Sequence, residues 1–365
     1  MSQLIVEICK IKEVKSHPNA DRLDIITVKG WNCIVSKNLY KVGDLVIYCP
    51  PDTIIPSNLI EQYKLEFLKK NGKVGNIKLR GELSQGLILD VPTYLPFPHE
   101  GKDVAEFMGF KKYEQPEPEY SIKTGQQQSK RKANPLFDKY TDIENIKNFD
   151  EILEDDEIVV ITEKIHGCNA RYANLPKSTN NIFQWLVTKL FGSHEFVYGS
   201  RTVQKKWTNI HKGFYKEDVW GKIAHKYKIN EWLPKDYILY GEIYGKGIQD
   251  LTYGLNDIEF RIFDIKYKGK YLNNDEFEVT FLEFIQLCEK SSNQILLKVP
   301  LLYWGKYNKN LLSLCKSESI ICPSQLREGC VIKPTHEREH YKLGRVILKV
   351  INPDYLTRKN GTEFK

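Results

Sequence analysis

Residues 111–135 form the segment that most limits how this chain can fold. Most of the segment is the run EQPEPEYSIKTGQQQSKRKANP, which is rich in Pro, Gln and charge and offers almost nothing to bury. Such a composition is typical of a linker. With 365 residues, the chain is too long for a single hydrophobic core. At 41% hydrophobic residues, it is apolar enough to form two. We therefore expect domains at residues 1–110 and 136–365, joined by a linker at 111–135.

The two expected domains differ in their secondary-structure patterns. In the first, short extended runs separated by turn residues predict a small β-barrel. In the second, helical stretches alternate with strands. The barrel strands are expected at residues 4–14, 24–28, 32–36 and 45–48, at Ile77 and at 86–89. In the second domain we expect helices at 142–153 and 278–289, and strands at 157–162, 238–240, 259–265, 329–333 and 345–350. The fold class is therefore α+β.

Composition excludes several classes of protein. No run approaches the roughly 18 apolar residues that a membrane helix needs, and the N-terminus lacks the pattern of a signal peptide. The 8 cysteines are scattered, without spacing for a disulfide framework or a zinc site. We expect an intracellular protein that does not bind membranes. The net charge of +7 is compatible with a polyanionic partner.

Lys164 is the most informative residue of the second domain. It follows a β-branched strand, Ile158–Thr162, and precedes His166-Gly167. An isolated lysine at a strand end is usually a surface residue, but five further charged segments follow this one in order. They are Gly199–Arg201, Leu239–Gly245, Phe260–Ile265, Arg327–Pro334 and Arg345–Val350.

This ordered set resembles motifs I, Ia, III, IIIa, IV and V of the covalent nucleotidyltransferases, which include ligases and capping enzymes. The sequence KIHGCN around Lys164 resembles that of the RNA ligase 2 branch in particular. The resemblance implies an ATP-grasp-like nucleotidyltransferase core that follows an OB-type barrel. It further implies an ATP-dependent RNA ligase, in which the Lys164 amine attacks the α-phosphate of ATP and forms a lysyl-AMP.

A lysine nucleophile must lose its proton, and a free lysine with a pKa of about 10.4 is almost fully protonated at neutral pH. Lys333 and Lys349 are the candidate cations that would disfavour the ammonium and neutralise charge on the α-phosphate. Many relatives carry a KxK sequence in motif V, but this chain reads Lys349-Val350-Ile351. The contribution of the second lysine is therefore missing or comes from elsewhere.

The resemblance assigns further residues to the nucleotide and to a metal. Glu242 and Glu328 each border a glycine, and their family role is to hold the ribose and a hydrated Mg²⁺ or Mn²⁺, which suggests contact through water. Phe263 is the aromatic residue expected to stack on adenine. Glu163 and Ile165, the neighbours of Lys164, complete the expected ATP site.

Three residues are expected to contact RNA. Asn169 and Arg201 look like the residues that RNA ligases use on the nucleotide and on the 3′-terminal end of the RNA, and the fork of donors on arginine suits phosphate. His166 occupies the place where many relatives have Asp. Imidazole is a poor ligand for Mg²⁺, so we expect His166 on the RNA side rather than on the metal.

The N-terminal barrel adds a second resemblance. Residues 14–23, VKSHPNADRL, followed by Cys33–Ser36, resemble the start of tRNA-binding OB domains. We therefore expect an RNA partner, with a nicked duplex or an RNA/DNA hybrid left open, and a monomeric protein. Two alternatives also stay open: a non-catalytic RNA-binding protein with a degenerate core, and a DNA ligase or capping-type enzyme. The sequence does not decide between nicks and free ends.

Overall fold

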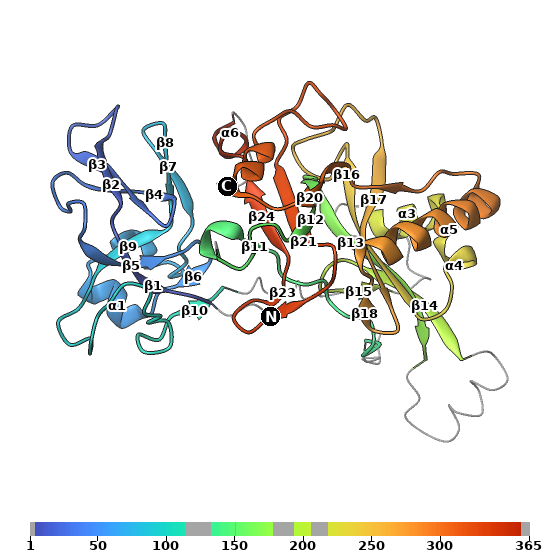
Figure 1. Cartoon of the computed structure of the whole chain (residues 1–365), viewed down its shortest axis with the longest axis horizontal. Coiled ribbons are helices and arrows are strands. Elements are labelled where there is room, and N and C mark those ends of the chain that lie inside the picture. Colours follow the sequence, from blue (N-terminus) through green and yellow to red (C-terminus); the bar gives the residue numbers. More distant parts are fainter. Residues whose placement is uncertain (1–3, 114–132, 150, 178–192, 206–217, 359–365) are drawn as a thin grey trace, which may run out of the picture.

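A computed structural model describes residues 4–113, 133–149, 151–177, 193–205 and 218–358. Most of its regular structure is strand, with a few helices, which confirms the α+β class. Figure 1 shows the first domain on the left and the two main sheets of the second domain on the right. Among the described residues, no helix has the length and apolarity needed to cross a bilayer.

The first domain is built from short antiparallel strands around two apolar clusters. The larger cluster contains Val6, Ile47 and Leu89, and the smaller contains Ile26 and Cys33. Its elements are β1 (Glu7–Lys10), β2 (Glu13–Ser16), β3 (Leu23–Val28), β4 (Trp31–Ser36), β5 (Leu45–Cys49), β6 (Thr53–Ile54), α1 (Ser57–Gln62), a 3-10 turn (Glu66–Leu68), β7 (Asn76–Leu79), β8 (Glu82–Gln85), β9 (Leu87–Asp90) and β10 (Lys111–Lys112).

The strand predictions for this domain hold with small differences. The single run expected at residues 4–14 is two strands, β1 and β2, which belong to different sheets. β10 pairs with β6, so residues 111–112 join a sheet of the first domain. The rest of the expected linker lies mostly outside the described residues. The exact domain bounds therefore stay a prediction.

A five-stranded sheet and a seven-stranded sheet form the second domain. The five-stranded sheet has the order β11 (Glu144–Asn145), β24 (Leu348–Ile351), β21 (Gly329–Pro334), β12 (Ile158–Lys164) and β20 (Leu301–Lys306). The seven-stranded sheet has the order β15 (Gln204–Lys205), β14 (His194–Gly199), β13 (Cys168–Pro176), β16 (Tyr237–Gly245), β17 (Ile258–Tyr267) and β18 (Lys270–Tyr271), with β19 (Leu297–Lys298) beside β17. The remaining elements are α3 (Val219–Lys226), α4 (Ile229–Trp232), α5 (Asn274–Ser292), α6 (Pro353–Thr357), β22 (Glu339–His340), β23 (Gly344–Arg345) and 3-10 turns at Ile146–Asn148 and Lys309–Cys315.

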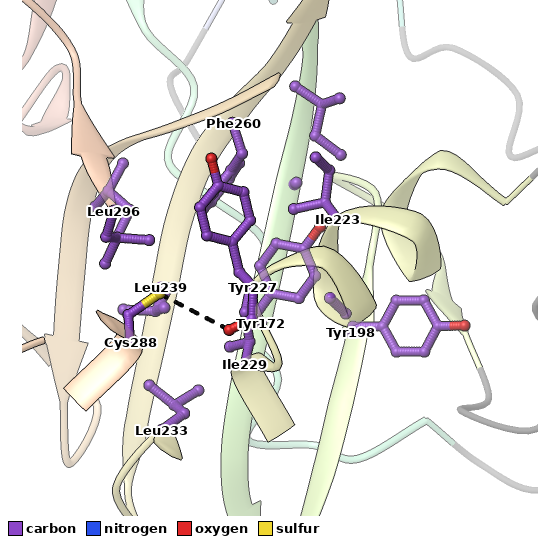
Figure 2. Close-up of a cluster of buried hydrophobic side chains, with 14 of the residues drawn as sticks. Tyr172, Tyr198, Ile223, Tyr227, Ile229, Leu233, Leu239, Phe260, Cys288 and Leu296 are labelled. Carbon is purple, nitrogen blue, oxygen red and sulfur yellow. Dashed lines mark hydrogen bonds between the residues drawn. The ribbon is translucent and has the colours of Figure 1, made fainter. Parts of the chain in front are cut away.

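The helices α3, α4 and α5 cover one face of the seven-stranded sheet. Their apolar side chains and those of the sheet form the largest buried cluster, with Tyr172, Tyr227 and Phe260 at its centre (Figure 2). This packing leaves the opposite face of the sheet free to form a wall of a cavity. Helix α5 is longer than the predicted 278–289, because Asn273 and Glu276 form a capping box that starts it earlier.

The helix predicted at residues 142–153 is wrong. Residues 144–145 form β11, which pairs in parallel with β24, and a single 3-10 turn follows. The side chain of Asn145 accepts a hydrogen bond from the Lys147 amide and so starts this turn. Ile146 and Phe149 lie three residues apart and are both buried against the five-stranded sheet. A strand followed by a 3-10 turn therefore gives the apolar spacing that suggested a helix.

Candidate active site

Lys164 is the last residue of β12 and lies opposite Gly329 of β21. Its ammonium donates to Glu328 Oε1 at 2.7 Å, although 164 residues separate the two in sequence. The side chain of Lys164 is 26% exposed and that of Glu328 12% exposed. The lysine is therefore half-buried and paired, unlike an ordinary surface lysine at a strand end.

Strand pairing places further residues on the same face of the sheet as Lys164. Lys349 of β24 is opposite Val331, which in turn is opposite Thr162, two residues before Lys164. Burial lowers the pKa of Lys349, and repulsion by Lys164 lowers it further. On the same face, Ile351 stands where the second lysine is expected, opposite Gly329, which in turn lies opposite Lys164. One lysine of this strand therefore faces the cavity, where many relatives are expected to have two.

The seven-stranded sheet contributes Asn169 and Glu242, which lie opposite each other on β13 and β16. Burial raises the pKa of Glu242 to about 8, against the lowering effect of Lys164, and the neighbouring Glu328 raises it further. Two buried oxygen atoms near Lys164 lack a hydrogen-bond partner within the described structure: Asn169 Oδ1 and Glu328 Oε2. Buried oxygen atoms of this kind indicate a site that a ligand completes.

His166 is buried beside Glu328. Its Nε2 lies 2.7 Å from Asp250 Oδ1, and its Nδ1 lies 2.7 Å from the Tyr355 hydroxyl and 3.9 Å from Glu328 Oε2. Its backbone amide donates to the Tyr253 hydroxyl. Both ring nitrogens are thus engaged within the protein, and an RNA contact by His166 stays a prediction.

The neighbours of Lys164 point elsewhere, as alternation along a strand requires. The carboxylate of Glu163 is 1% exposed and accepts from the Ser319 hydroxyl at 2.5 Å and from the Ile320 amide at 2.8 Å. The side chain of Ile165 packs in a cluster with Tyr244. Their expected roles in binding ATP stay predictions.

Lys333 lies on the same face as Lys164 but four residues further along the paired strands, opposite Val160. At about 3.3 Å per residue, this places it roughly 13 Å from the nucleophile along the strand direction. Its ammonium donates to Asp264 Oδ1 at 3.0 Å. In this arrangement Lys333 belongs to a second charged cluster, and its role beside the α-phosphate stays a prediction.

That second cluster is held together by Asp264, which is fully buried. Its Oδ2 accepts from Arg345 Nη2 at 2.6 Å and from the Tyr140 hydroxyl at 2.8 Å. Arg345 also donates to both oxygens of Glu337, at 2.5 and 2.6 Å. Burial raises the pKa of Asp264, but Arg345 and Lys333 outweigh this effect and hold the pKa below its ordinary value.

Strict alternation along the run at residues 260–265 predicts that Asp264 shares a face with Phe260 and Ile262. This prediction is wrong, and a β-bulge is the reason. Tyr240 lies opposite Asp264 whereas Gly241 lies opposite Ile262, so Phe263 is an extra residue in β17. The bulge reverses the alternation after Phe263. Asp264 therefore faces the cavity side, and Ile265 joins Phe260 and Ile262 in the core beneath the helices. Phe263 itself lines the cavity, with its ring centroid 4.8 Å from that of Tyr140.

Arg201 lies after β14, at the edge of the cavity, with 48% of its side chain exposed. Its guanidinium pairs with Asp142. The ammonium of Lys112, from the first domain, lies 3.8 Å from the same carboxylate and 2.7 Å from Glu144. Asp142 and Glu144 thus join the two domains at this edge.

The two sheets and the first domain enclose a cavity of about 1570 Å³. Nine of the residues expected from sequence line it: Glu163, Lys164, Ile165, Asn169, Arg201, Glu242, Phe263, Lys333 and Lys349. Glu328 and His166 are buried beside Lys164 and do not line the cavity. Lys73 and Lys112 of the first domain complete one wall.

Sequence reasoning missed several residues of this site. Asp250 and Tyr355 contact His166 from 84 and 189 residues away, and no local motif marks either of them. The segment that resembled tRNA-binding domains has a structural use. His17 Nε2 lies 3.1 Å from the Leu79 carbonyl, and the Asn19 side chain donates to the Arg80 carbonyl, so both fix the β7–β8 hairpin.

Comparison with known proteins identifies both parts of the chain. Residues 157–351 match the model of the RNA ligase family, and residues 5–91 match an OB-fold domain. A comparison with curated proteins found no match.

Solved structures of Naegleria gruberi RNA ligase share the fold. The enzyme with pyrophosphate aligns with a TM-score of 0.65 at 22% identity, over 97% of this chain and 98% of that chain. A point mutant with ATP and Mn aligns with a TM-score of 0.66 at 22% identity, over 96% and 98%. Together with the two domain matches, this shared fold confirms the expected OB-type domain ahead of an RNA ligase core. Because the family model accounts for more than half of the 365 residues, this chain belongs to the RNA ligase family.

Proposed function

We propose that this protein is an ATP-dependent RNA ligase that joins 3′-OH and 5′-phosphate RNA ends in RNA repair, with Lys164 as the nucleophile. The observation that carries the proposal is the placement of Lys164 in the cavity, 2.7 Å from Glu328 and close enough to Lys349 to affect its pKa. Family membership supports ligase activity. The Naegleria gruberi enzyme, with the same fold, has been solved with ATP and Mn, which supports both as ligands here.

In the first step, the Lys164 amine forms a bond to the α-phosphorus of ATP, and the bond from that phosphorus to the pyrophosphate oxygen breaks. The lysine must first give up a proton. Glu328 Oε1, at 2.7 Å from Nζ, is placed to hold it. Lys349 is a second cation near the amine, and its charge opposes a second ammonium there while favouring the charged phosphate.

The residues beside Lys164 fit a divalent cation. Glu328 Oε2 has no hydrogen-bond partner among the described residues. Burial opposes ionisation of Glu242, and the neighbouring Glu328 opposes a second negative charge, so the pKa of Glu242 is about 8. A hydrated Mg²⁺ or Mn²⁺ held by Glu242 and Glu328 would relieve both conditions. Such an ion supplies positive charge near the α-phosphate.

Phe263 and Asn169 are the nucleotide contacts in this proposal. Phe263 lies on the cavity wall at a bulge, where it presents a ring for adenine. Asn169 Oδ1 is buried and unsatisfied, so it is ready to accept a hydrogen bond from a ribose or an RNA end.

In the second step, a 5′-phosphate oxygen of RNA attacks the phosphorus of lysyl-AMP, and the bond from that phosphorus to Lys164 breaks. In the third, the RNA 3′-OH attacks the 5′-phosphorus and AMP leaves. Arg201, at the edge of the cavity, is the proposed contact for the RNA end. The OB-type domain supports RNA as the polymer that is joined.

The deciding experiment incubates the protein with ATP and Mg²⁺ or Mn²⁺ and measures its mass. We expect the gain of one AMP in the wild type and in Lys270→Ala, a lysine elsewhere on the cavity wall, but not in Lys164→Ala. Nicked duplexes with ribose or deoxyribose at the 3′ end then test the polymer. A wild-type protein that never gains AMP would favour a non-catalytic RNA-binding protein, and preferential sealing of deoxyribose ends would favour a DNA ligase.

A further inference from the structure

The short helix α6 is fixed directly to the strand that follows Glu328. Its N-cap residue, Asn352, is 1% exposed and its side chain accepts from the Asp354 amide. The Asn352 backbone amide donates to the Glu328 carbonyl at 2.9 Å, and its side-chain amide donates to the Arg327 carbonyl at 3.2 Å. A movement of α6 therefore also moves the backbone of Glu328.

The same helix reaches His166 through Tyr355, which is 1% exposed. The Tyr355 hydroxyl lies 2.7 Å from His166 Nδ1, and Asp250 Oδ1 lies 2.7 Å from Nε2. An ionised carboxylate only accepts hydrogen bonds, so Nε2 carries a proton, and in the neutral imidazole Nδ1 then accepts from the tyrosine hydroxyl. The two partners thus fix both the tautomer and the orientation of the imidazole.

Arg358, immediately after α6, closes the arrangement. Its Nη2 and Nε donate to Asp250 Oδ2 at 2.7 and 3.2 Å, and its Nη1 donates to the Tyr355 carbonyl at 2.7 Å. The guanidinium also lies 3.7 Å from the centroid of the Tyr355 ring. Arg358 therefore contacts both Asp250 and Tyr355, the two residues that orient His166.

His166 in turn lies between this arrangement and the nucleophile. Its backbone follows Lys164 by two residues, and its Nδ1 is 3.9 Å from Glu328 Oε2, the unsatisfied oxygen of the carboxylate that binds Lys164. A rotation of the imidazole would push on Glu328 or open space beside it. Residues that fix a group next to a catalytic centre commonly change activity 10- to 100-fold when lost.

We propose that Tyr355, Arg358 and Asp250 are positioning residues for AMP attachment to Lys164, acting through His166 and Glu328. This inference rests on the proposed function. It gives the C-terminal helix a part in the reaction although none of the three side chains lines the cavity around Lys164.

The test is a single-turnover measurement of AMP attachment over a series of ATP concentrations up to saturation, in Tyr355→Phe, Arg358→Ala and Arg358→Lys. We expect the rate constant to fall about 10- to 100-fold in the first two, with the final extent of reaction and the half-saturating ATP concentration unchanged. Arg358→Lys should recover part of the rate, because a cation again faces Asp250. Tyr48→Phe is the control. It removes a buried hydroxyl that donates to the Gln85 carbonyl in the first domain, and we expect the wild-type rate.

Rate constants within twofold of wild type in both Tyr355→Phe and Arg358→Ala would overturn the inference. So would a loss confined to the final extent of reaction, because that reports misfolded molecules rather than misplaced groups. A wild-type protein that takes up no AMP would instead overturn the proposed function, and the inference with it. Nitrogen chemical shifts of His166 provide a check that needs no ATP: Tyr355→Phe should move the Nδ1 resonance and Tyr48→Phe should not.

Discussion

Two groups of buried charges lie beside the same cavity, and they differ in how completely their members are paired. The group around Lys164, with Glu242, Glu328 and Lys349, leaves buried oxygen unsatisfied on Glu328, and Asn169 beside it leaves another. In the second group, which contains Lys333, Asp264, Arg345 and Glu337, both oxygens of Asp264 accept from cations and from the Tyr140 hydroxyl. We call them the open cluster and the closed cluster.

Lysines on neighbouring strands of one sheet can therefore have different roles. A closed cluster joins the two sheets, since Asp264 comes from one sheet and Lys333 from the other. In an open cluster some buried oxygen atoms lack a hydrogen-bond partner within the described structure, and a ligand can supply one. We therefore expect substitutions in the open cluster to affect chemistry first and those in the closed cluster to affect stability first.

The largest expected effect is that of Lys164→Met. It should abolish AMP attachment, because the amine that forms the bond to AMP is lost, while the melting temperature changes little. Lys333→Met should instead lower the melting temperature, because Asp264 loses one of its cations. Mass spectrometry after incubation with ATP, together with thermal unfolding, tests both. If Lys333→Met lost as much AMP attachment as Lys164→Met and kept its melting temperature, the distinction between the two clusters would be wrong.

The next largest effect is on stability, in Asp264→Asn. It leaves Arg345 and Lys333 buried without the more deeply buried of the two carboxylates that they share, which should cost about 3–5 kcal/mol of unfolding free energy. Asp257→Asn, which breaks an exposed pair with Lys222, should cost about 1 kcal/mol or less. Denaturant unfolding measures both.

The same variant has a pH signature. The pKa of Asp264 is lowered in the folded protein. Its contribution to stability is therefore present above the unfolded pKa of about 3.9 and is lost as pH falls through the folded value. The difference between wild type and Asp264→Asn should narrow below about pH 4. A difference independent of pH in that range would contradict a paired, ionised Asp264.

Local sequence patterns predicted most strands, and the family resemblance named nine residues that line the cavity. Strands such as β12 and β21 are short apolar runs, and charged residues at their ends mark the motifs. The pairing that separates the clusters was not predictable, because it depends on register between residues far apart in sequence. Lys333 and Lys349 looked equivalent, yet strand register places one opposite Val160 and the other level with Thr162.

Two features of the site could not be predicted, for more specific physical reasons. The bulge at Phe263 reverses the alternation of β17, and nothing in the run FRIFDI shows that an extra residue is present. The network around His166 uses Asp250 and Tyr355, whose places are set by loops and by α6 rather than by a motif. Both features depend on tertiary packing.

A smaller effect is expected from Asn169→Ala and Arg201→Ala. Both residues line the cavity and are proposed to contact the nucleotide or the RNA end rather than to form the bond to AMP. AMP attachment should therefore fall less than sealing, which we expect to drop about 10- to 100-fold. The control is Asn174→Ala, on the same strand, where the side chain donates to the Leu233 carbonyl. Single-turnover assays with ATP and with pre-adenylylated RNA separate the steps. Equal losses at both steps would remove the proposed division of labour.

The smallest effect concerns the stability of the open cluster without a metal. The pKa of Glu242 is raised to about 8, so its folded state favours the protonated carboxyl. Its contribution to stability is then fully present below the unfolded pKa of about 4.3 and is lost as pH rises through about 8. We expect the melting temperature of metal-free protein to fall by a few degrees more across this range in wild type than in Glu242→Gln. Added Mn²⁺ should offset the fall in wild type only, because a cation stabilises the ionised carboxylate. If the melting temperatures of Glu242→Gln and wild type changed equally with pH, with and without Mn²⁺, the open cluster would not be the cation site. Only the reactivity of Lys164 would then distinguish it from the closed cluster.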